Sequence, residues 1–225
     1  MNIALIVFGG KGERISSQVP KQFIKINGKD LVGYTIETFE RHPLVDSIIL
    51  VAPKDYVTYT KNLVLTSRFY KVANVVPGGA NRQESVRNGL NALKAHDNDH
   101  ILIHDGDRPL ISDSLITLCL REIRKHNALI PVIRHEEALE EVSNSGRRYV
   151  KDNVIYDIQT PQCFKFKLIK DAHNKLKDEE FCDDASLIES LGGEVILVPG
   201  DKLNFKVTKD EDLEYLKTIL EKKNA

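Results

Sequence analysis

Short apolar runs recur along the chain, and the first of them, Ile3–Phe8, stops at Gly9-Gly10. A continuous apolar run that ends in a glycine turn is typical of a strand buried on both faces of a parallel sheet. Between the runs, apolar residues return every three or four positions, which is the period of an amphipathic helix. The pattern predicts strands at Ile3–Phe8, Ser47–Ala52, Lys71–Val76, His100–His104, Ala128–Val132 and Val195–Val198.

Helices are predicted between these strands and at the end of the chain. Because strands and helices alternate, we expect an α/β fold with right-handed crossovers. No internal repeat, low-complexity linker or change of composition marks a boundary, so residues 1–225 are expected to form a single domain. The predicted helices are Leu31–Arg41, Asp55–Val64, Gln83–Ala95, Ser112–His126, Lys167–Leu176 and Asp210–Lys223.

Residues 134–157 break this alternation. Two polar halves are joined there by a Ser-Asn-Ser-Gly turn, a pattern that indicates an extended hairpin. Such an arm could project from the body and pair with a second subunit, or it could be a solvated surface excursion. The residues alone leave both interpretations open.

Composition and charge exclude several classes of protein. The 32 Lys and Arg against 33 Asp and Glu give a net charge of −1. The protein as a whole therefore has no general electrostatic attraction for nucleic acid or anionic membranes, and any phosphate site must come from a local group of cations. The 3 Cys are widely spaced and suit neither a disulfide framework nor a zinc site. No secretory signal or membrane-length apolar run is present. We therefore expect a soluble cytoplasmic protein.

The loop after the first strand, FGGKGERISSQVPKQF, is the first candidate for chemistry, because ligands of open α/β sheets bind beyond the carboxyl ends of strands. A dinucleotide fingerprint would need Gly where Ile15 stands, and a P-loop would need Gly-Lys-Ser/Thr, so both motifs fail. A phosphate or nucleotide cradle and a plain surface turn remain. The loop supplies the glycines Gly9, Gly10 and Gly12 and the cations Lys11, Arg14 and Lys21.

A second glycine turn, Gly78-Gly79, leads into a predicted helix that begins with Arg82 and Ser85. A helix N-terminus with free N–H groups and an arginine suits a base edge or a phosphate. A capped helix with an exposed arginine explains the same residues equally well.

The third candidate is Asp105-Gly106-Asp107-Arg108, directly after the apolar strand HILIH. A carboxylate at a strand end is well placed for Mg²⁺ bound to phosphates, since this ion takes one or two carboxylates. Arg108 could then hold a second phosphoryl group. An Asp–Arg ion pair that fixes the turn is the structural alternative.

Three further segments are weak when taken singly: QTPQ at 159–162, DDAS at 183–186 and NFKVT at 204–208. The acidic pair at 183–184 could be a solvated helix cap, and Lys206 could be an ordinary surface lysine.

Read in order, the segments resemble the cytidylyltransferases that join CTP to a polyol phosphate, namely the methylerythritol phosphate and ribitol phosphate enzymes. The resemblance implies a Rossmann-like nucleotidyltransferase fold with a mixed, mainly parallel sheet and a projecting β-arm at 134–157 that builds a homodimer. The matching segments are GGKGERISSQVPKQF, GGANRQESVRNGL, HDGDRP, QTPQCF, DDAS and NFKVTKDEDL.

The resemblance also implies roles for single residues. Arg14, Lys21 and Lys206 would be catalytic: Arg14 and Lys21 would contact the CTP phosphates and stabilise charge at the α-phosphorus. Arg108 and Lys206 would hold the acceptor phosphate and the reacting phosphoryl group, while Asp105 would hold Mg²⁺ and help to place the acceptor. The residues implied to bind substrate, chiefly around the phosphates, cytosine and ribose, are Gly9, Gly10, Gly12, Gly78, Gly79, Arg82 and Ser85.

Some positions depart from the family's pattern. Phe8 stands where alanine is usual, and Gly106 and Asp107 stand where small residues follow Asp105. In the arm, Glu137-Ala138 replace an Asp-Thr pair and Asp152 replaces an arginine, so the acceptor pocket is expected to have changed. Lys151, Arg147 or Arg148 are candidates for the lost positive charge.

The acceptor is left open. The DDAS segment resembles the methylerythritol branch, the length of 132–142 resembles the ribitol branch, and a third polyol or sugar phosphate is a further candidate. We expect an acceptor phosphate oxygen to attack the α-phosphorus of CTP in line, without a covalent intermediate. A non-catalytic nucleotide-binding protein, or a sugar-phosphate nucleotidyltransferase that uses another triphosphate, is the alternative.

Overall fold

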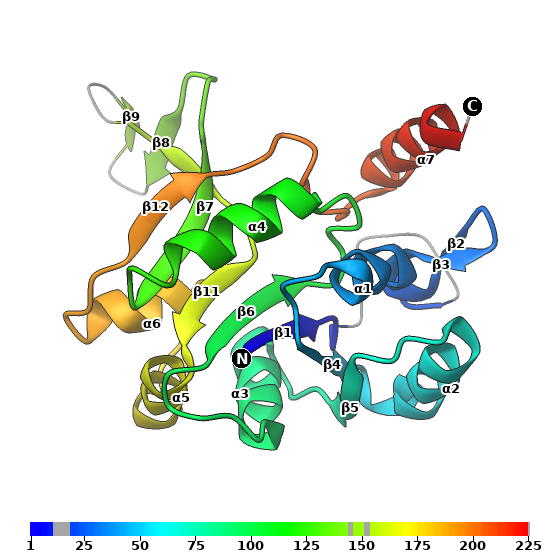
Figure 1. Cartoon of the computed structure of the whole chain (residues 1–225). Coiled ribbons are helices and arrows are strands. Elements are labelled where there is room, and N and C mark those ends of the chain that lie inside the picture. The colour runs from blue at the N-terminus through cyan, green and yellow to red at the C-terminus, as the bar shows by residue number, and fades with distance from the viewer. Residues whose placement is uncertain (11–18, 144–145, 151–153, 225) are drawn as a thin grey trace.

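The computed structural model describes residues 1–10, 19–143, 146–150 and 154–224. A central sheet separates two layers of helices (Figure 1). Its strands are β1 (Asn2–Val7), β4 (Ser47–Ala52), β5 (Val72–Pro77), β6 (His100–Asp105), β7 (Ala128–Arg134), β10 (Tyr156–Ile158), β11 (Gln162–Lys165) and β12 (Ile196–Pro199). The order is β10-β7-β11-β6-β1-β4-β5, with β12 paired to β7.

The sheet is mixed but mainly parallel. β1 runs parallel to β4 and β6, β5 is parallel to β4, and β12 is parallel to β7. β11 lies antiparallel between β6 and β7, and β10 is antiparallel to β7. The predicted α/β class and mixed, mainly parallel sheet are therefore confirmed.

The central strands are apolar on both faces because each face is covered by helices. Along β1, Ile6 packs into the core on one side of the sheet, and Leu5 packs into the core on the other. The first core is closed by α1 (Leu31–Arg41), α2 (Val57–Ser67) and α4 (Asp113–Glu122). The second is closed by α3 (Arg82–Ala92), α5 (Phe166–Lys175) and α6 (Asp184–Ser190).

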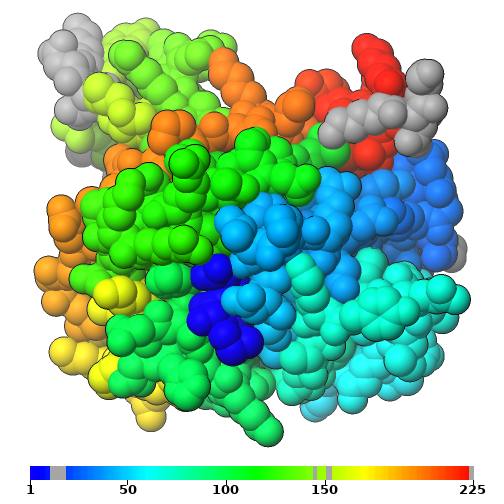
Figure 2. Space-filling model, in the orientation of Figure 1, coloured from blue at the N-terminus to red at the C-terminus, as the bar shows by residue number. Residues whose placement is uncertain are grey.

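The C-terminal helix α7 (Asp210–Asn224) closes a third, smaller apolar cluster. Its Leu213 and Leu216 are buried with Leu31, at the start of α1, and with Val207, which precedes the helix. Figure 2 shows α7 in red beside the blue segment that holds β2 (Lys25–Ile26) and β3 (Lys29–Asp30). The end of the chain is thereby packed against the segment that follows the first loop.

Several elements were not predicted from the sequence, among them β11 and α6. β11 has only four residues and joins the middle of the sheet against the direction of its neighbours, which no alternating β–α pattern anticipates. α6 is likewise short, and its capping box, formed by Asp183 and Ser186, is the only local signal for it. Predicted helices 83–95 and 112–126 also extend past the observed ends, at Ala92 and Glu122.

The expected hairpin in 134–157 is present. β8 (Glu140–Ser143) and β9 (Gly146–Tyr149) pair antiparallel, and every residue in them is exposed. The hairpin is carried between β7 and β10, two paired strands at one side of the sheet (Figure 1). In the part of the chain that the structure describes, no helix is both long and apolar enough to cross a membrane.

A histidine lies near the carboxyl end of β6 and is fully buried. His104 Nδ1 is 2.9 Å from Thr160 Oγ1, and its Nε2 is 3.4 Å from the carbonyl oxygen of Arg108. Burial lowers the pKa of His104 from 6.5 to about 3, so the folded protein keeps this ring neutral.

We expect the fold to lose stability in acid partly through His104. Between about pH 6.5 and pH 3, His104 is protonated in the unfolded chain but neutral in the folded protein. The free energy of unfolding therefore falls as the pH drops from 6.5 toward 3. The contribution approaches about 1.4 kcal/mol per pH unit. Urea titrations between pH 7 and pH 4 should give a shallower pH dependence for His104→Gln than for the wild type. Equal slopes would contradict this assignment.

Candidate active site

A cavity of about 1060 Å³ opens beyond the carboxyl ends of β6, β1, β4 and β5. These four strands are neighbours in the sheet, so the loops that follow them meet at one edge. The cavity is lined by residues from each loop, together with Lys21 from the end of the first loop and Lys206 from the segment before α7.

The two glycine turns touch each other at the floor of the cavity. A Cβ placed on Gly78 would lie 3.1 Å from the Cα of Gly9, and one placed on Gly9 would lie 3.3 Å from the Cα of Gly78. Side chains at these positions would force the two loops apart. The two glycines therefore allow the loop after β1 and the loop after β5 to pack closely. Without side chains there, the loop backbone itself forms part of the cavity surface.

Ser85 holds the second glycine turn against α3. Its Oγ donates to the carbonyl oxygen of Asn81 at 2.8 Å and accepts from the N–H of Gly79 at 3.0 Å. Asn81 is the N-cap of α3, and its side chain accepts from the N–H of Glu84. The start of α3 thus faces the cavity in a fixed conformation.

Gln22 holds the first glycine turn in place, as Ser85 holds the second. This side chain is buried, and its Nε2 donates to the carbonyl oxygens of Phe8 and Gly10, both at 2.8 Å. The neighbouring Lys21 begins the short helix η1 (Lys21–Phe23). Its Nζ lies 2.6 Å from Asp107 Oδ2 and donates to the carbonyl oxygen of Val207 at 2.7 Å.

Asp105 is the electrostatic centre of the site. Its Oδ1 accepts from Arg82 Nε at 3.2 Å, and its Oδ2 accepts from Lys206 Nζ at 3.0 Å and from Arg108 Nε at 3.4 Å. Burial alone would raise the pKa of Asp105, but the charges of these three cations outweigh it and hold the pKa well below its ordinary value. Asp105 is therefore a carboxylate at any physiological pH.

A second buried carboxylate, that of Asp184, also forms an ion pair with Arg82. Asp184, at the start of α6, lies 2.8 Å from Arg82 Nη1, and its other oxygen is 3.0 Å from Nε2 of the buried His173. Arg82 and His173 hold the pKa of Asp184 below its ordinary value although burial opposes this. The expectation of a solvated acidic pair at 183–184 is wrong for Asp184, which is 1% exposed.

The segment from Asp201 to Val207, here called the C-terminal strap, is tied to the strand ends by polar contacts. Gln159 exchanges two hydrogen bonds with the backbone of Asp201, and Asn204 Nδ2 donates to the carbonyl oxygen of Thr160 at 2.7 Å. Arg108 Nη1 donates to the carbonyl oxygen of Asn204 at 2.8 Å. These contacts place Lys206, whose side chain is 34% exposed, at the cavity wall.

Most of the predicted site residues meet in this cavity. Arg108 lies near the cavity but does not line it. Its side chain is buried, and its hydrogen bonds to Asp105 and to the carbonyl oxygen of Asn204 connect β6 to the C-terminal strap. Gly12 and Arg14, predicted from the same loop, lie outside the described residues, as does Lys11. The predicted residues that line the cavity are Gly9, Gly10, Lys21, Gly78, Gly79, Arg82, Ser85, Asp105 and Lys206.

The structure explains two of the departures next to the cavity as a matched pair. A Cβ on Gly106 would lie 2.9 Å from Cδ1 and 3.2 Å from Cγ of the Phe8 ring, so the aromatic residue at position 8 favours glycine at position 106. The Phe8 ring packs edge-on against Phe23 at 6.1 Å between ring centroids, and Phe23 stacks on Tyr56 at 4.7 Å. These rings support η1, which carries Lys21.

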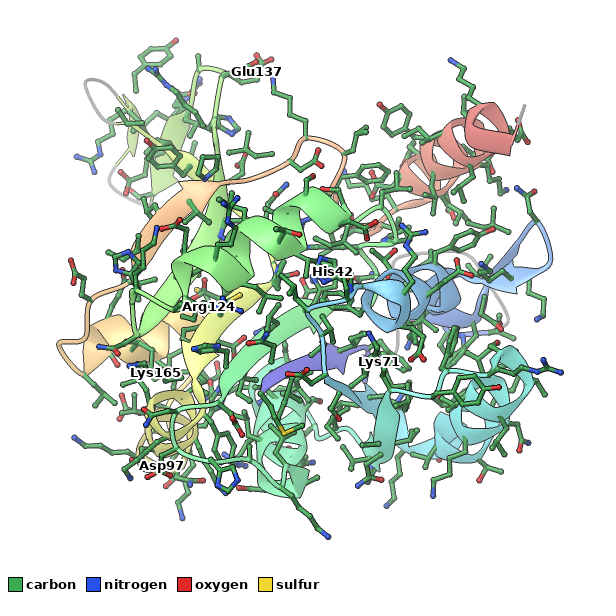
Figure 3. The ribbon with its side chains drawn as sticks, viewed as in Figure 1. His42, Lys71, Asp97, Arg124, Glu137 and Lys165 are labelled. Atoms are coloured by element: carbon green, nitrogen blue, oxygen red, sulfur yellow. The ribbon has the colours of Figure 1, made fainter. Side chains whose placement is uncertain are left out.

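The departures in the arm lie away from the cavity of their own chain. Glu137 and Ala138 are exposed on the segment between β7 and β8, where Figure 3 shows Glu137 at the top of the view. Arg147 and Arg148 form ion pairs with the arm glutamates Glu140 and Glu141. The other positions singled out there, 151 and 152, lie outside the described residues.

This arrangement defines a class of protein. An α/β sheet whose strand ends collect two glycine turns, a helix N-terminus, lysines and a carboxylate is suited to hold the phosphates of a nucleotide and to neutralise charge there. Fold and site together are those of a nucleotidyltransferase.

Comparisons with known proteins identify the family. Residues 2–222 match the model of the 2-C-methyl-D-erythritol 4-phosphate cytidylyltransferase (IspD) family, and the chain belongs to that family. The enzyme of that name from Clostridium perfringens strain SM101 is 40% identical over 215 residues, covering 94% of this chain and 95% of the relative. That from Clostridium novyi is 38% identical over 225 residues, covering 98% and 96%.

Solved structures agree. The 2-C-methyl-D-erythritol 4-phosphate cytidylyltransferase of Francisella tularensis matches with a TM-score of 0.81 and 27% identity, covering 97% of this chain and 99% of that one. The 4-diphosphocytidyl-2C-methyl-D-erythritol synthase of Anaerococcus prevotii gives the same TM-score and identity, covering 98% and 96%. The resemblance drawn from the motifs is confirmed, as is the prediction of a CTP-dependent nucleotidyltransferase.

Proposed function

We propose that the protein transfers a cytidylyl group from CTP to 2-C-methyl-D-erythritol 4-phosphate, releasing pyrophosphate and a CDP-alcohol. The observation that carries this proposal is that Lys21, Asp105 and Lys206, which are far apart in the sequence, share one cavity with the two glycine turns. Family membership supports methylerythritol phosphate over ribitol phosphate as the acceptor. The altered arm keeps other polyol phosphates among the acceptors to be tested.

The chemistry follows from the charges in the cavity. A phosphate monoester is a nucleophile at neutral pH, so one of its oxygens forms a bond to the α-phosphorus of CTP while the bond to the β-phosphate bridging oxygen breaks. The protein must bring the two anions together and stabilise the added charge. Lys21 and Lys206 stand on opposite sides of Asp107 and supply that positive charge. Arg82, fixed by Asp105 and Asp184, orients the nucleotide.

Mg²⁺ is part of the proposal, with Asp105 as its protein ligand. In the described part of the chain no group of three or more His, Cys, Asp or Glu side chains could hold a metal by itself. The Asp105 carboxylate at the cavity wall suits a hard ion that takes most of its other ligands from substrate phosphates and water. Bound there, Mg²⁺ would neutralise triphosphate charge.

The acceptor is identified by a pyrophosphate-release assay with CTP and methylerythritol 4-phosphate, or the phosphates of ribitol, ribulose, xylulose and glycerol. We expect methylerythritol 4-phosphate to give the highest kcat/KM, with little release when UTP replaces CTP. A higher kcat/KM with another polyol phosphate would reassign the acceptor. CTP binding without release for any acceptor would contradict transferase activity.

The same assay tests the metal. Release is expected to stop with excess EDTA and to return when Mg²⁺ is added beyond the chelator. Undiminished release in EDTA would remove the metal from the reaction.

Lys21→Ala and Lys206→Ala are expected to lower kcat roughly 100- to 1000-fold, because each removes a donor aimed at the reacting phosphates. Circular dichroism should show both variants folded. Lys29→Ala is the matched control, since Lys29 also pairs with a carboxylate, Glu37 at 2.7 Å, but does not line the cavity. Near-normal turnover in either site variant would exclude that lysine from the mechanism.

The proposal includes a homodimer built through the arm. Val142 and Tyr149 are 70% and 65% exposed, and the hairpin register places both on the same face. Apolar side chains on a two-stranded ribbon need a partner to leave water.

Sedimentation of the 25.5 kDa chain should give a dimer, and the double variant Val142→Asp/Tyr149→Asp a monomer. Tyr70→Asp, at a tyrosine 83% exposed outside the arm, should remain dimeric. A monomeric wild type, or a dimeric double variant, would refute the role of the arm.

A further inference from the structure

A carboxylate, Asp107, stands next to Lys21, the lysine assigned above to the reacting phosphates. Asp107 follows β6 by two positions, and its Oδ2 lies 2.6 Å from Lys21 Nζ. Both side chains are largely buried, at 13% and 10% exposed. An anion so close to a phosphate site repels the substrate phosphates. We therefore expect Asp107 to contribute something to the reaction that offsets this repulsion.

We propose that Asp107 is a positioning residue for Lys21: its carboxylate fixes the ammonium group against the C-terminal strap, in the orientation that meets the substrate phosphates. The inference rests on the proposed function, because it assigns Lys21 to the reacting phosphates.

The contacts around Lys21 form a closed triangle. Lys21 Nζ bonds to the Asp107 carboxylate and to the carbonyl oxygen of Val207, and the N–H of Val207 donates to the carbonyl oxygen of Asp107 at 2.9 Å. Three distant segments, η1, the turn after β6 and the C-terminal strap, therefore meet at one ammonium group. An ammonium has three N–H bonds, and among the described residues two of them are used in the triangle, which leaves the third to meet substrate.

This fixation matters because lysine is a flexible side chain. Its four-carbon stem has many rotamers, and a mobile lysine would lose their entropy on meeting the transition state. Burial and two hydrogen bonds remove that freedom before substrate arrives, which is preorganisation of a positive charge. The rings of Phe23 and Tyr56 stiffen the same segment from the other side.

Asp107 also separates two ammonium groups. Its Oδ1 is buried, has no hydrogen bond to the described residues, and lies 4.0 Å from Lys206 Nζ. A carboxylate between Lys21 and Lys206 lets both remain close and positively charged, since each repels the other less than it is attracted to the anion. The two lysines thereby keep a fixed spacing across the cavity.

A positioning role and a purely structural role of Asp107 predict different effects of its substitution on kcat, KM and stability. Asp107→Asn keeps the shape and removes the charge, so Lys21 is held less firmly while repulsion of the triphosphate falls. We expect kcat to drop about 10- to 100-fold and the KM for CTP to stay equal or fall. The urea midpoint should change little. A rise in KM together with a large loss of stability would mean a structural role only.

A double-mutant cycle shows whether Asp107 acts through Lys21. In a Lys21→Met background, measured in single turnover, Asp107→Asn should change the rate less than about twofold, because the group it positions is gone. An undiminished effect in that background would overturn the proposal. Asp107→Glu should recover part of the lost kcat. Glu37→Gln, which breaks the exposed Lys29–Glu37 pair outside the cavity, is the control and should leave kcat unchanged.

A readout without turnover separates this inference from the function itself. Labelling with acetic anhydride, followed by mass spectrometry, should show Lys21 protected in the wild type and several-fold more reactive in Asp107→Asn. Equal reactivity in the two proteins would refute the positioning role. If no acceptor supports pyrophosphate release while this difference in labelling is present, the proposed function has failed and the Asp107–Lys21 contact stands only as a packing feature.

Discussion

The ion-pair network around Asp105 is the constraint on which the rest of the site depends. One buried carboxylate at the end of β6 holds Arg82 from α3, Arg108 from its own turn and Lys206 from the C-terminal strap. Removing this shared carboxylate would leave the buried Arg108 charge uncompensated, which is strongly destabilising. The network therefore determines which residues face the cavity and couples the middle of the chain to its end.

The parallel order of β6, β1, β4 and β5 makes that network possible. Their carboxyl ends lie side by side, so Asp105, Gly9 and Gly78 come together although about 70 residues or more separate the first glycine from the others. The C-terminal strap then brings Lys206 back across the same edge, held by Arg108 and Gln159. Local glycine turns supply the backbone surface, and long-range ion pairs supply the charge.

The sequence predicted the layered fold because the buried parallel strands are continuous apolar runs. It missed β11 and α6, which are short and whose placement depends on tertiary pairing. Among site residues, glycine turns and cations after strands could be predicted from position and chemistry. Gln22, Asp184 and His173 could not, because their importance comes from burial and from partners distant in the sequence. Arg108 was expected at the substrate, but the structure places it beneath Asp105, where its contacts are with the protein itself.

The proposed reaction requires the first glycine loop and the C-terminal strap to converge on one triphosphate. A crystal structure of the protein with CTP and Mg²⁺ would show whether they do. We expect cytosine and ribose against the Gly78–Ser85 turn, with phosphate oxygens within hydrogen-bond distance of both Lys21 and Lys206. A nucleotide bound elsewhere, or phosphates that contact neither lysine, would contradict it.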